Sequence, residues 1–155
     1  MSVRRMTGRR RQFGLPQLLA LLAAIAVGVH VYGLYRPSGP PTPVWFPYAD
    51  KVQHLIGFAV PVCLLVLALR QPGRDRAGST RSRAVPVVIA IFVLHGLASE
   101  LAQHYFYTFR TGDPLDVLAD WAGVLLGWGM ASLVFRDRRV QQLRRDHPAR
   151  AQVER

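Results

Sequence analysis

Apolar residues along this chain are gathered into four long blocks rather than into alternating or amphipathic patterns. The blocks run over Leu15 to Tyr35, Asp50 to Leu69, Ala84 to Phe106 and Pro114 to Phe135. Each is close to the roughly 20 residues that an α-helix needs to cross a hydrocarbon layer of about 30 Å. Continuous Leu, Ala and Val runs also fit helices better than the alternating strands of a barrel. The pattern therefore predicts an all-α, polytopic membrane protein with a bundle of four transmembrane helices.

The sequence outside these blocks divides the chain into three parts. Residues 1–14 are a basic N-terminus, residues 15–135 are the four-helix transmembrane domain, and residues 136–155 are a basic tail. From about residue 140 the tail is polar and has few apolar residues to bury, so we expect it to be a frayed helix or disordered.

Positive charge is spread unevenly between the two ends of the predicted bundle. The net charge is +11, and 17 of the 20 Lys and Arg residues precede the first block, separate the second from the third, or follow the fourth. Only Arg36, Lys51 and Arg110 fall in the other two connections or at their edges. This is the positive-inside asymmetry, which predicts a multi-pass protein of the cell membrane with both termini cytoplasmic. This topology also explains the basic excess. A secondary attraction to anionic membrane lipid is expected of such flanks, and the chain has no motif for binding nucleic acid.

Polar residues recur near the same end of the last three blocks. Glu100, Gln103 and His104 share one face of the third helix, Asp120 lies about 10 Å inside the fourth, and His54 lies somewhat less deep in the second. Inserting an ionisable residue deep in a spanning helix costs on the order of 2.5 to 3.5 kcal/mol, so such residues usually face a bundle interior and mark function. We expect them to converge in one outward-facing layer; the alternative is a hydrogen-bonded layer that only fixes helix register.

Charged residues near the helix starts have two interpretations. Asp113 and Asp50 either cap the fourth and second helices or form the rim of the site, and Asp116 suits the first turn of its helix. Lys51 and Arg110 are expected to face each other at the rim. Since the acids outnumber the bases, we expect either a divalent cation that joins carboxylates to an anionic ligand, or an Arg110–Asp116 pair with partial protonation of the deeper acids. The sequence indicates no other cofactor.

Two glycines on the fourth helix, Gly123 and Gly127, form a G-x-x-x-G motif. Small residues at this spacing let two helix backbones approach closely in a membrane. We expect this face of the helix to pack against a neighbouring helix.

Three segments carry a resemblance to a known family: DKVQHLIGF (Asp50 to Phe58), GLASELAQ (Gly96 to Gln103) and FRTGDPLDVLADWAGVLLG (Phe109 to Gly127). They resemble the VanZ-like membrane family, which includes a teicoplanin-resistance protein. The resemblance covers roughly residues 15–135 and departs at Asp120, where the family usually has Asn. The family's motif residues fall on Asp50, Lys51, His54, Glu100, Gln103, Arg110, Asp113, Asp116, Gly123 and Gly127.

The resemblance implies an integral membrane protein of the bacterial cell envelope with a role in glycopeptide resistance. Together with the polar layer it predicts a binder of a lipid-linked cell-wall precursor or a glycopeptide-related anionic ligand, through Lys51, His54, Glu100, Gln103, Arg110, Asp116 and Asp120. Two alternatives stay open. One is a membrane enzyme acting on a phospholipid or polyprenyl phosphate, with His54, Glu100, His104 and the aspartates as acid/base groups. The other is a small transporter that assembles as a homo-oligomer. The sequence has no H-E-x-x-H, G-x-S-x-G or P-loop motif.

Overall fold

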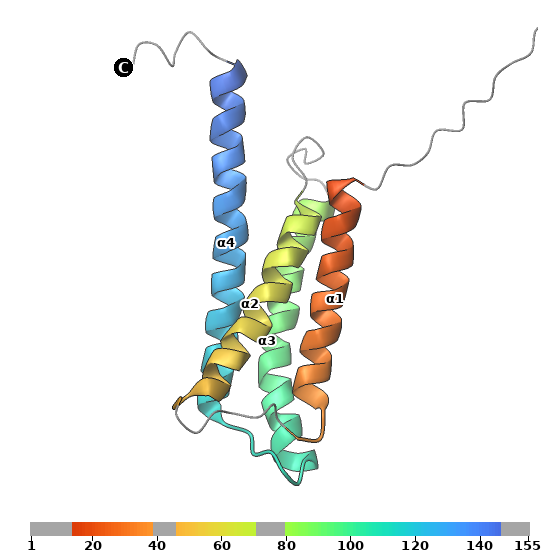
Figure 1. Cartoon of the computed structure of the whole chain (residues 1–155), viewed down its shortest axis with the longest axis vertical. Coiled ribbons are helices and arrows are strands. Elements are labelled where there is room, and N and C mark those ends of the chain that lie inside the picture. The colour runs from red at the N-terminus through yellow and green to blue at the C-terminus, as the bar shows by residue number, and fades with distance from the viewer. Residues whose placement is uncertain (1–13, 39–45, 71–79, 147–155) are drawn as a thin grey trace, which may run out of the picture.

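The computed structural model describes residues 14–38, 46–70 and 80–146. These residues form four helices and no strand: α1 (Leu15–Tyr35), α2 (Ala49–Leu69), α3 (Thr80–Phe106) and α4 (Pro114–Asp146). The helices run up and down, so that the start of α1 and the end of α4 lie at one end of the bundle (Figure 1). The predicted all-α fold with four long apolar helices is confirmed.

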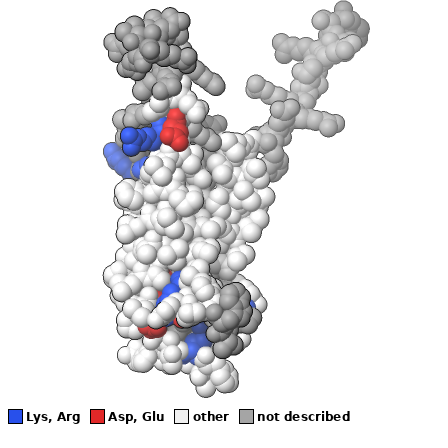
Figure 2. Space-filling model, turned by 60° about the vertical axis from the view of Figure 1, so that its left-hand side comes forward, with Lys and Arg blue, Asp and Glu red and all other residues white. Residues whose placement is uncertain are grey.

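Each helix is long and apolar enough to cross a membrane. The 21 residues of α1 or of α2 span about 32 Å at 1.5 Å per residue, which matches a hydrocarbon layer of about 30 Å. The face in Figure 2 carries Lys, Arg, Asp and Glu at its two ends and a band of other residues between them. Large apolar side chains such as Val29, Leu94 and Leu125 are exposed on the outside of the helices. The described chain therefore has the architecture of a multi-pass membrane protein.

The predicted bounds differ from the structure mainly at the end of α4. The apolar part of this helix was expected to end at Phe135, but the helix continues to Asp146. Residues 140–146 are thus helical, one of the two alternatives expected for the tail, and its remaining residues lie outside the described residues. The physical reason is local: RDRRVQQLRRD contains good helix formers and no Gly or Pro before Pro148.

The most extensive helix contact joins α2 and α4. A Cβ atom added at Gly123 would meet the carbonyl oxygen of Leu55, and one added at Gly127 would meet that of Ala59. The two glycines therefore let the backbone of α4 lie directly against that of α2, as the G-x-x-x-G spacing predicts. Phe58, Val62, Val66 and Val124 fill the core beside this contact.

Candidate functional site

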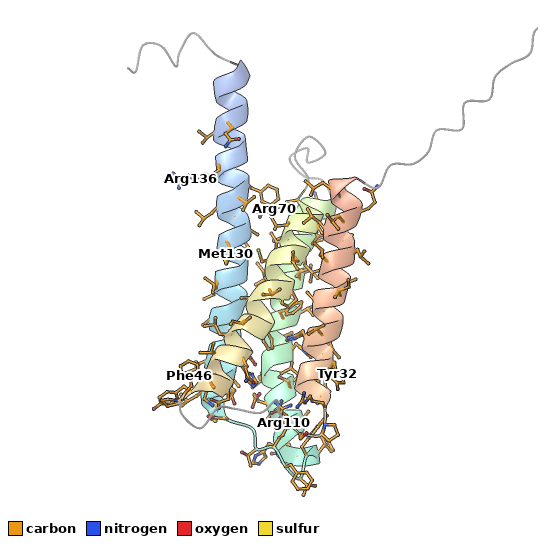
Figure 3. The ribbon with its side chains drawn as sticks, viewed as in Figure 1. Tyr32, Phe46, Arg70, Arg110, Met130 and Arg136 are labelled. Atoms are coloured by element: carbon orange, nitrogen blue, oxygen red, sulfur yellow. The ribbon has the colours of Figure 1, made fainter. Side chains whose placement is uncertain are left out.

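Polar side chains gather at the end of the bundle where α1 connects to α2 and α3 connects to α4. Arg110 lies at this end, while Arg70 and Arg136 lie at the opposite end (Figure 3). The buried polar or charged residues of α2, α3 and α4 are His54, Ser99, Glu100, Gln103, Asp116 and Asp120. The structure thus brings polar residues of three helices into one layer. We call these residues, together with Asp50, Lys51 and Asp113 at its rim, the polar layer.

One half of the polar layer, the lysine cluster, consists of Lys51 and three carboxylates. Lys51 Nζ lies 2.8 Å from Asp50 Oδ2, 2.5 Å from Asp113 Oδ2 and 2.7 Å from Asp116 Oδ1. Its side chain is only 17% exposed. The prediction that Lys51 faces Arg110 at the rim is therefore wrong: the ammonium group is enclosed by acids from α2 and from the start of α4.

Asp113 is the cap of α4 as well as a partner of Lys51. Its Oδ1 accepts a hydrogen bond of 2.9 Å from the backbone N–H of Leu115, which confirms the predicted N-cap. The Lys51 ammonium and this N–H hold the pKa of the Asp113 carboxyl below its usual 3.8. The contribution of this carboxylate to stability is accordingly present above pH 3.8 and is lost as the pH falls below that value.

Asp50 does not cap α2, contrary to one of its two predicted roles. The helix begins at Ala49 after Tyr48, whose backbone is left-handed (φ 64°), so Asp50 lies inside the first turn. The turn at Phe46 to Ala49, closed by a backbone hydrogen bond of 3.3 Å, starts the helix earlier than the Asp-Lys pair suggested. Asp50 therefore remains at the rim, paired with Lys51.

The other half of the polar layer, the histidine cluster, consists of His54, Glu100 and Asp120 from α2, α3 and α4. His54 Nδ1 lies 2.8 Å from Asp120 Oδ1 and 3.8 Å from Glu100 Oε1. The second oxygen of Glu100 accepts a 3.0 Å hydrogen bond from the backbone N–H of Asp113. His54 Nε2 faces the lysine cluster, 3.9 Å from Asp116 Oδ2. One imidazole thus contacts acids from both neighbouring helices.

Arg110 binds the end of α1 rather than an acid of the polar layer. Its Nη1 donates to the carbonyl oxygens of Leu34, at 2.7 Å, and Gly33, at 3.3 Å. Gln103 donates to the same Leu34 oxygen at 3.4 Å. The last carbonyls of a helix have no partner within the helix and carry partial negative charge, so a cation is stable there. The expected Arg110–Asp116 pair is therefore wrong, because Asp116 pairs with Lys51.

His104 lies outside the polar layer, although its spacing from Glu100 suggested a shared face. The side chain is exposed and its ring stacks edge-on against Tyr105, with centroids 4.9 Å apart. This position does not support the acid/base role considered for it.

A groove of about 790 Å³ lies between α1 and α2 and ends at the polar layer. Its wall is aliphatic, with Leu22, Ile25, Val29, Ile56 and Val60 among the lining residues. Its polar lining residues are His30, Asp50, Gln53, His54, Gln103, Arg110, Thr111 and Asp116. The groove therefore offers an apolar channel that leads to charged and hydrogen-bonding groups.

Two histidines inside the bundle, one buried and one partly buried, were missed by the sequence analysis. His30 of α1 and His95 of α3 stack together, with ring centroids 5.3 Å apart, among Phe58 and Phe92. The Nε2 atom of each is buried without a hydrogen-bond partner among the described residues. The available signal was a lone histidine inside each apolar block, since ionisable residues within spans are rare.

Comparison of the chain with protein-family models, with curated proteins and with solved structures found no match. The site is therefore interpreted from its own geometry.

Proposed function

We propose that this protein binds the head group of a membrane lipid in the polar layer, with the lipid's chain along the groove between α1 and α2. The observation that carries this proposal is the groove itself: an aliphatic wall continuous with a polar end. Ligand sites of 300 to 1,000 Å³ commonly combine apolar walls with a few polar groups that fix orientation. A molecule with one apolar and one polar part fits both halves.

The proposed head group is anionic, as in lipid-linked cell-wall precursors. Arg110 lines the groove and offers a planar guanidinium suited to phosphate or carboxylate. Lys51 is already enclosed by three carboxylates, so Arg110 is the permanent cation best placed to meet the ligand. The resemblance to VanZ-like proteins supports this ligand class and, with it, a role in glycopeptide resistance.

The proposed orientation places both termini in the cytoplasm and the polar layer at the outer face, because 17 of 20 basic residues lie on the opposite side. In a Cys63→Ala background, a cysteine introduced at Ser38 is expected to react with an impermeant maleimide on intact cells, and one at Ser79 is expected to react only after lysis. Gel-shift or mass spectrometry reports the labelled fraction. Labelling at Ser79 but not Ser38 on intact cells would reverse the orientation.

Blocking the groove is expected to remove the bound lipid. Val29 lines the groove and is 66% exposed, so Val29→Trp fills the channel with little disturbance of the core. We expect the amount of co-purifying lipid, measured by mass spectrometry of protein in nanodiscs, to fall about tenfold, equivalent to about 1.4 kcal/mol. Arg110→Gln is expected to lower retention of anionic lipids selectively.

The matched control is Leu94→Trp on α3, which is 67% exposed and does not line the groove. It adds the same side chain to the lipid-facing surface and is expected to retain lipid as the unsubstituted chain does. Equal loss in both Trp variants, or full retention in Val29→Trp, would contradict the groove as the binding site.

Acid/base chemistry on the same head group is a second candidate, favoured by the His54–Asp120 contact. A carboxylate at Nδ1 fixes the imidazole so that Nε2 can accept a proton, and His54 lines the groove. If the protein is an enzyme, incubation with the captured lipid yields a product of altered mass that a His54→Gln variant does not form. Recovery of unchanged lipid supports binding alone.

A further inference from the structure

The polar layer contains two compact clusters of acids, and a permanent positive charge lies in only one of them. Ligand atoms of Asp50, Asp113 and Asp116 lie within 4.8 Å of one another, as do those of His54, Glu100 and Asp120. The first group already encloses a cation, the ammonium of Lys51. The ion pairs that the structure shows for Glu100 and Asp120 both go to His54. A single imidazole cannot balance two buried carboxylates, so the histidine cluster lacks positive charge.

Two carboxylate oxygens in the histidine cluster also lack a hydrogen bond. Glu100 is 4% exposed and Asp120 is fully buried, yet Glu100 Oε1 and Asp120 Oδ2 have no hydrogen-bond partner among the described residues. Buried polar atoms nearly always have a partner, and burial of an unpaired carboxylate is strongly unfavourable. Glu100 Oε1 is directed at the cluster, 3.8 Å from His54 Nδ1. Glu100 Oε1 is therefore in the position of a ligand, and so is Asp120 Oδ1, 2.8 Å from His54 Nδ1.

From this geometry we infer that His54, Glu100 and Asp120 bind one divalent transition-metal ion, of the Zn²⁺ or Mn²⁺ type. Imidazole nitrogen together with carboxylate oxygen suits these ions, whereas Mg²⁺ and Ca²⁺ prefer oxygen ligands alone. Bonds of about 2.1 Å place ligand atoms about 3.0 to 3.4 Å apart. The observed Nδ1 distances of 2.8 Å and 3.8 Å lie on either side of this range, so small side-chain movements suffice.

Metal binding at this site requires a free lone pair on His54 Nδ1. His54 Nδ1 and Asp120 Oδ1 lie 2.8 Å apart with one hydrogen between them, and the ion takes the place of that hydrogen. The Nδ1–metal and Oδ1–metal bonds form as this hydrogen leaves. In a neutral ring the proton moves to Nε2, which faces Asp116, and in a protonated ring, which already carries a hydrogen on Nε2, the proton leaves to solvent. The site joins α2, α3 and α4, so the ion acts as a cross-link between three helices.

The test uses the full chain in nanodiscs, with any affinity tag removed and bound metal stripped by a chelator. Adding Zn²⁺ or Mn²⁺ alone is expected to give about one ion per chain by elemental analysis after dialysis and a rise in melting temperature of about 5 °C or more. Because the probe is the metal without lipid, its failure is distinct from failure of the proposed lipid binding.

Glu100→Gln and Asp120→Asn are each expected to lower the bound metal at least tenfold. Asp137→Asn, which removes one exposed carboxylate elsewhere on α4, serves as the matched control and should bind as the unsubstituted chain does. His30→Phe should also retain the ion, which separates this site from the His30–His95 pair. Less than about one-tenth of an ion per unsubstituted chain would overturn the inference. The inference would also be overturned if a folded Glu100→Gln or Asp120→Asn protein bound as much metal as the Asp137→Asn control.

Discussion

Replacing Lys51 by Met is expected to lower the free energy of unfolding by about 3 kcal/mol. The substitution leaves three carboxylates within 4.8 Å of one another without the ammonium that lies 2.5 to 2.8 Å from each. Removing one partner of a buried ion pair costs about 3 to 5 kcal/mol. We place the effect at the lower limit because the side chains of Asp50 and Asp113 are 47% and 37% exposed and solvent screens them. Denaturation of the purified protein in bicelles measures it.

Two further variants separate charge from packing in the lysine cluster. Lys51→Met combined with Asp116→Asn is expected to recover part of the lost stability, since it removes the most buried of the three acids along with its partner. Millimolar Ca²⁺ should also stabilise Lys51→Met more than the unsubstituted chain, because three carboxylates without a lysine resemble an oxygen-ligand site. A Lys51→Met protein as stable as the unsubstituted chain would show that the cluster does not depend on the ammonium.

The sequence predicts the helices well because a membrane span depends on length and composition alone. Apolar blocks of about 20 residues set where α1 to α3 cross, and the polar first turn of α3 before Ala84 and the polar extension of α4 beyond Phe135 were missed. That extension depends on local helix propensity, which hydropathy does not report.

Most members of the polar layer were predicted, apart from Ser99 and the wrongly included His104, but their pairing was not. Helix spacing and depth place Glu100, Asp120 and His54 at a similar level of the bundle, where the structure brings them together. Which cation meets which acid depends on the rotation of each helix about its axis, and helices that are apolar on all sides do not fix that rotation by hydrophobic pattern. Lys51 and Arg110 were therefore assigned the wrong partners.

Gly123 and Gly127 indicate from the sequence how α4 is rotated about its own axis. Their spacing identifies the face of α4 that meets α2, and the same face carries Asp116 and Asp120. The carboxylates therefore face α2 because the glycines do. One face of α4 thus packs against α2 in the core and also carries the carboxylates of the polar layer.

Gly127→Ala is accordingly expected to destabilise the protein by about 1 to 3 kcal/mol, the usual cost of overpacking. The added Cβ would lie against the carbonyl oxygen of Ala59 and 3.1 Å from its Cα, and a backbone cannot rotate away as a side chain can. Gly129→Ala on the same helix is the matched control, since a Cβ there meets nothing within 4 Å. The control should be neutral or stabilising by up to about 1 kcal/mol, because Ala favours helix more than Gly does. Thermal unfolding of the two purified variants gives the comparison.

Gly123→Ala is expected to disturb the histidine cluster as well as the packing of α4 against α2. Its Cβ would meet the carbonyl oxygen of Leu55, the residue that follows His54, and would push this part of α2 away from α4. Because His54 Nδ1 and Asp120 Oδ1 are 2.8 Å apart across that contact, a shift of about 1 Å breaks their hydrogen bond. We therefore expect Gly123→Ala to lose metal as well as stability, while Gly129→Ala keeps both. A Gly123→Ala protein that is destabilised yet binds metal as the unsubstituted chain does would show that the α2–α4 contact and the histidine cluster are independent.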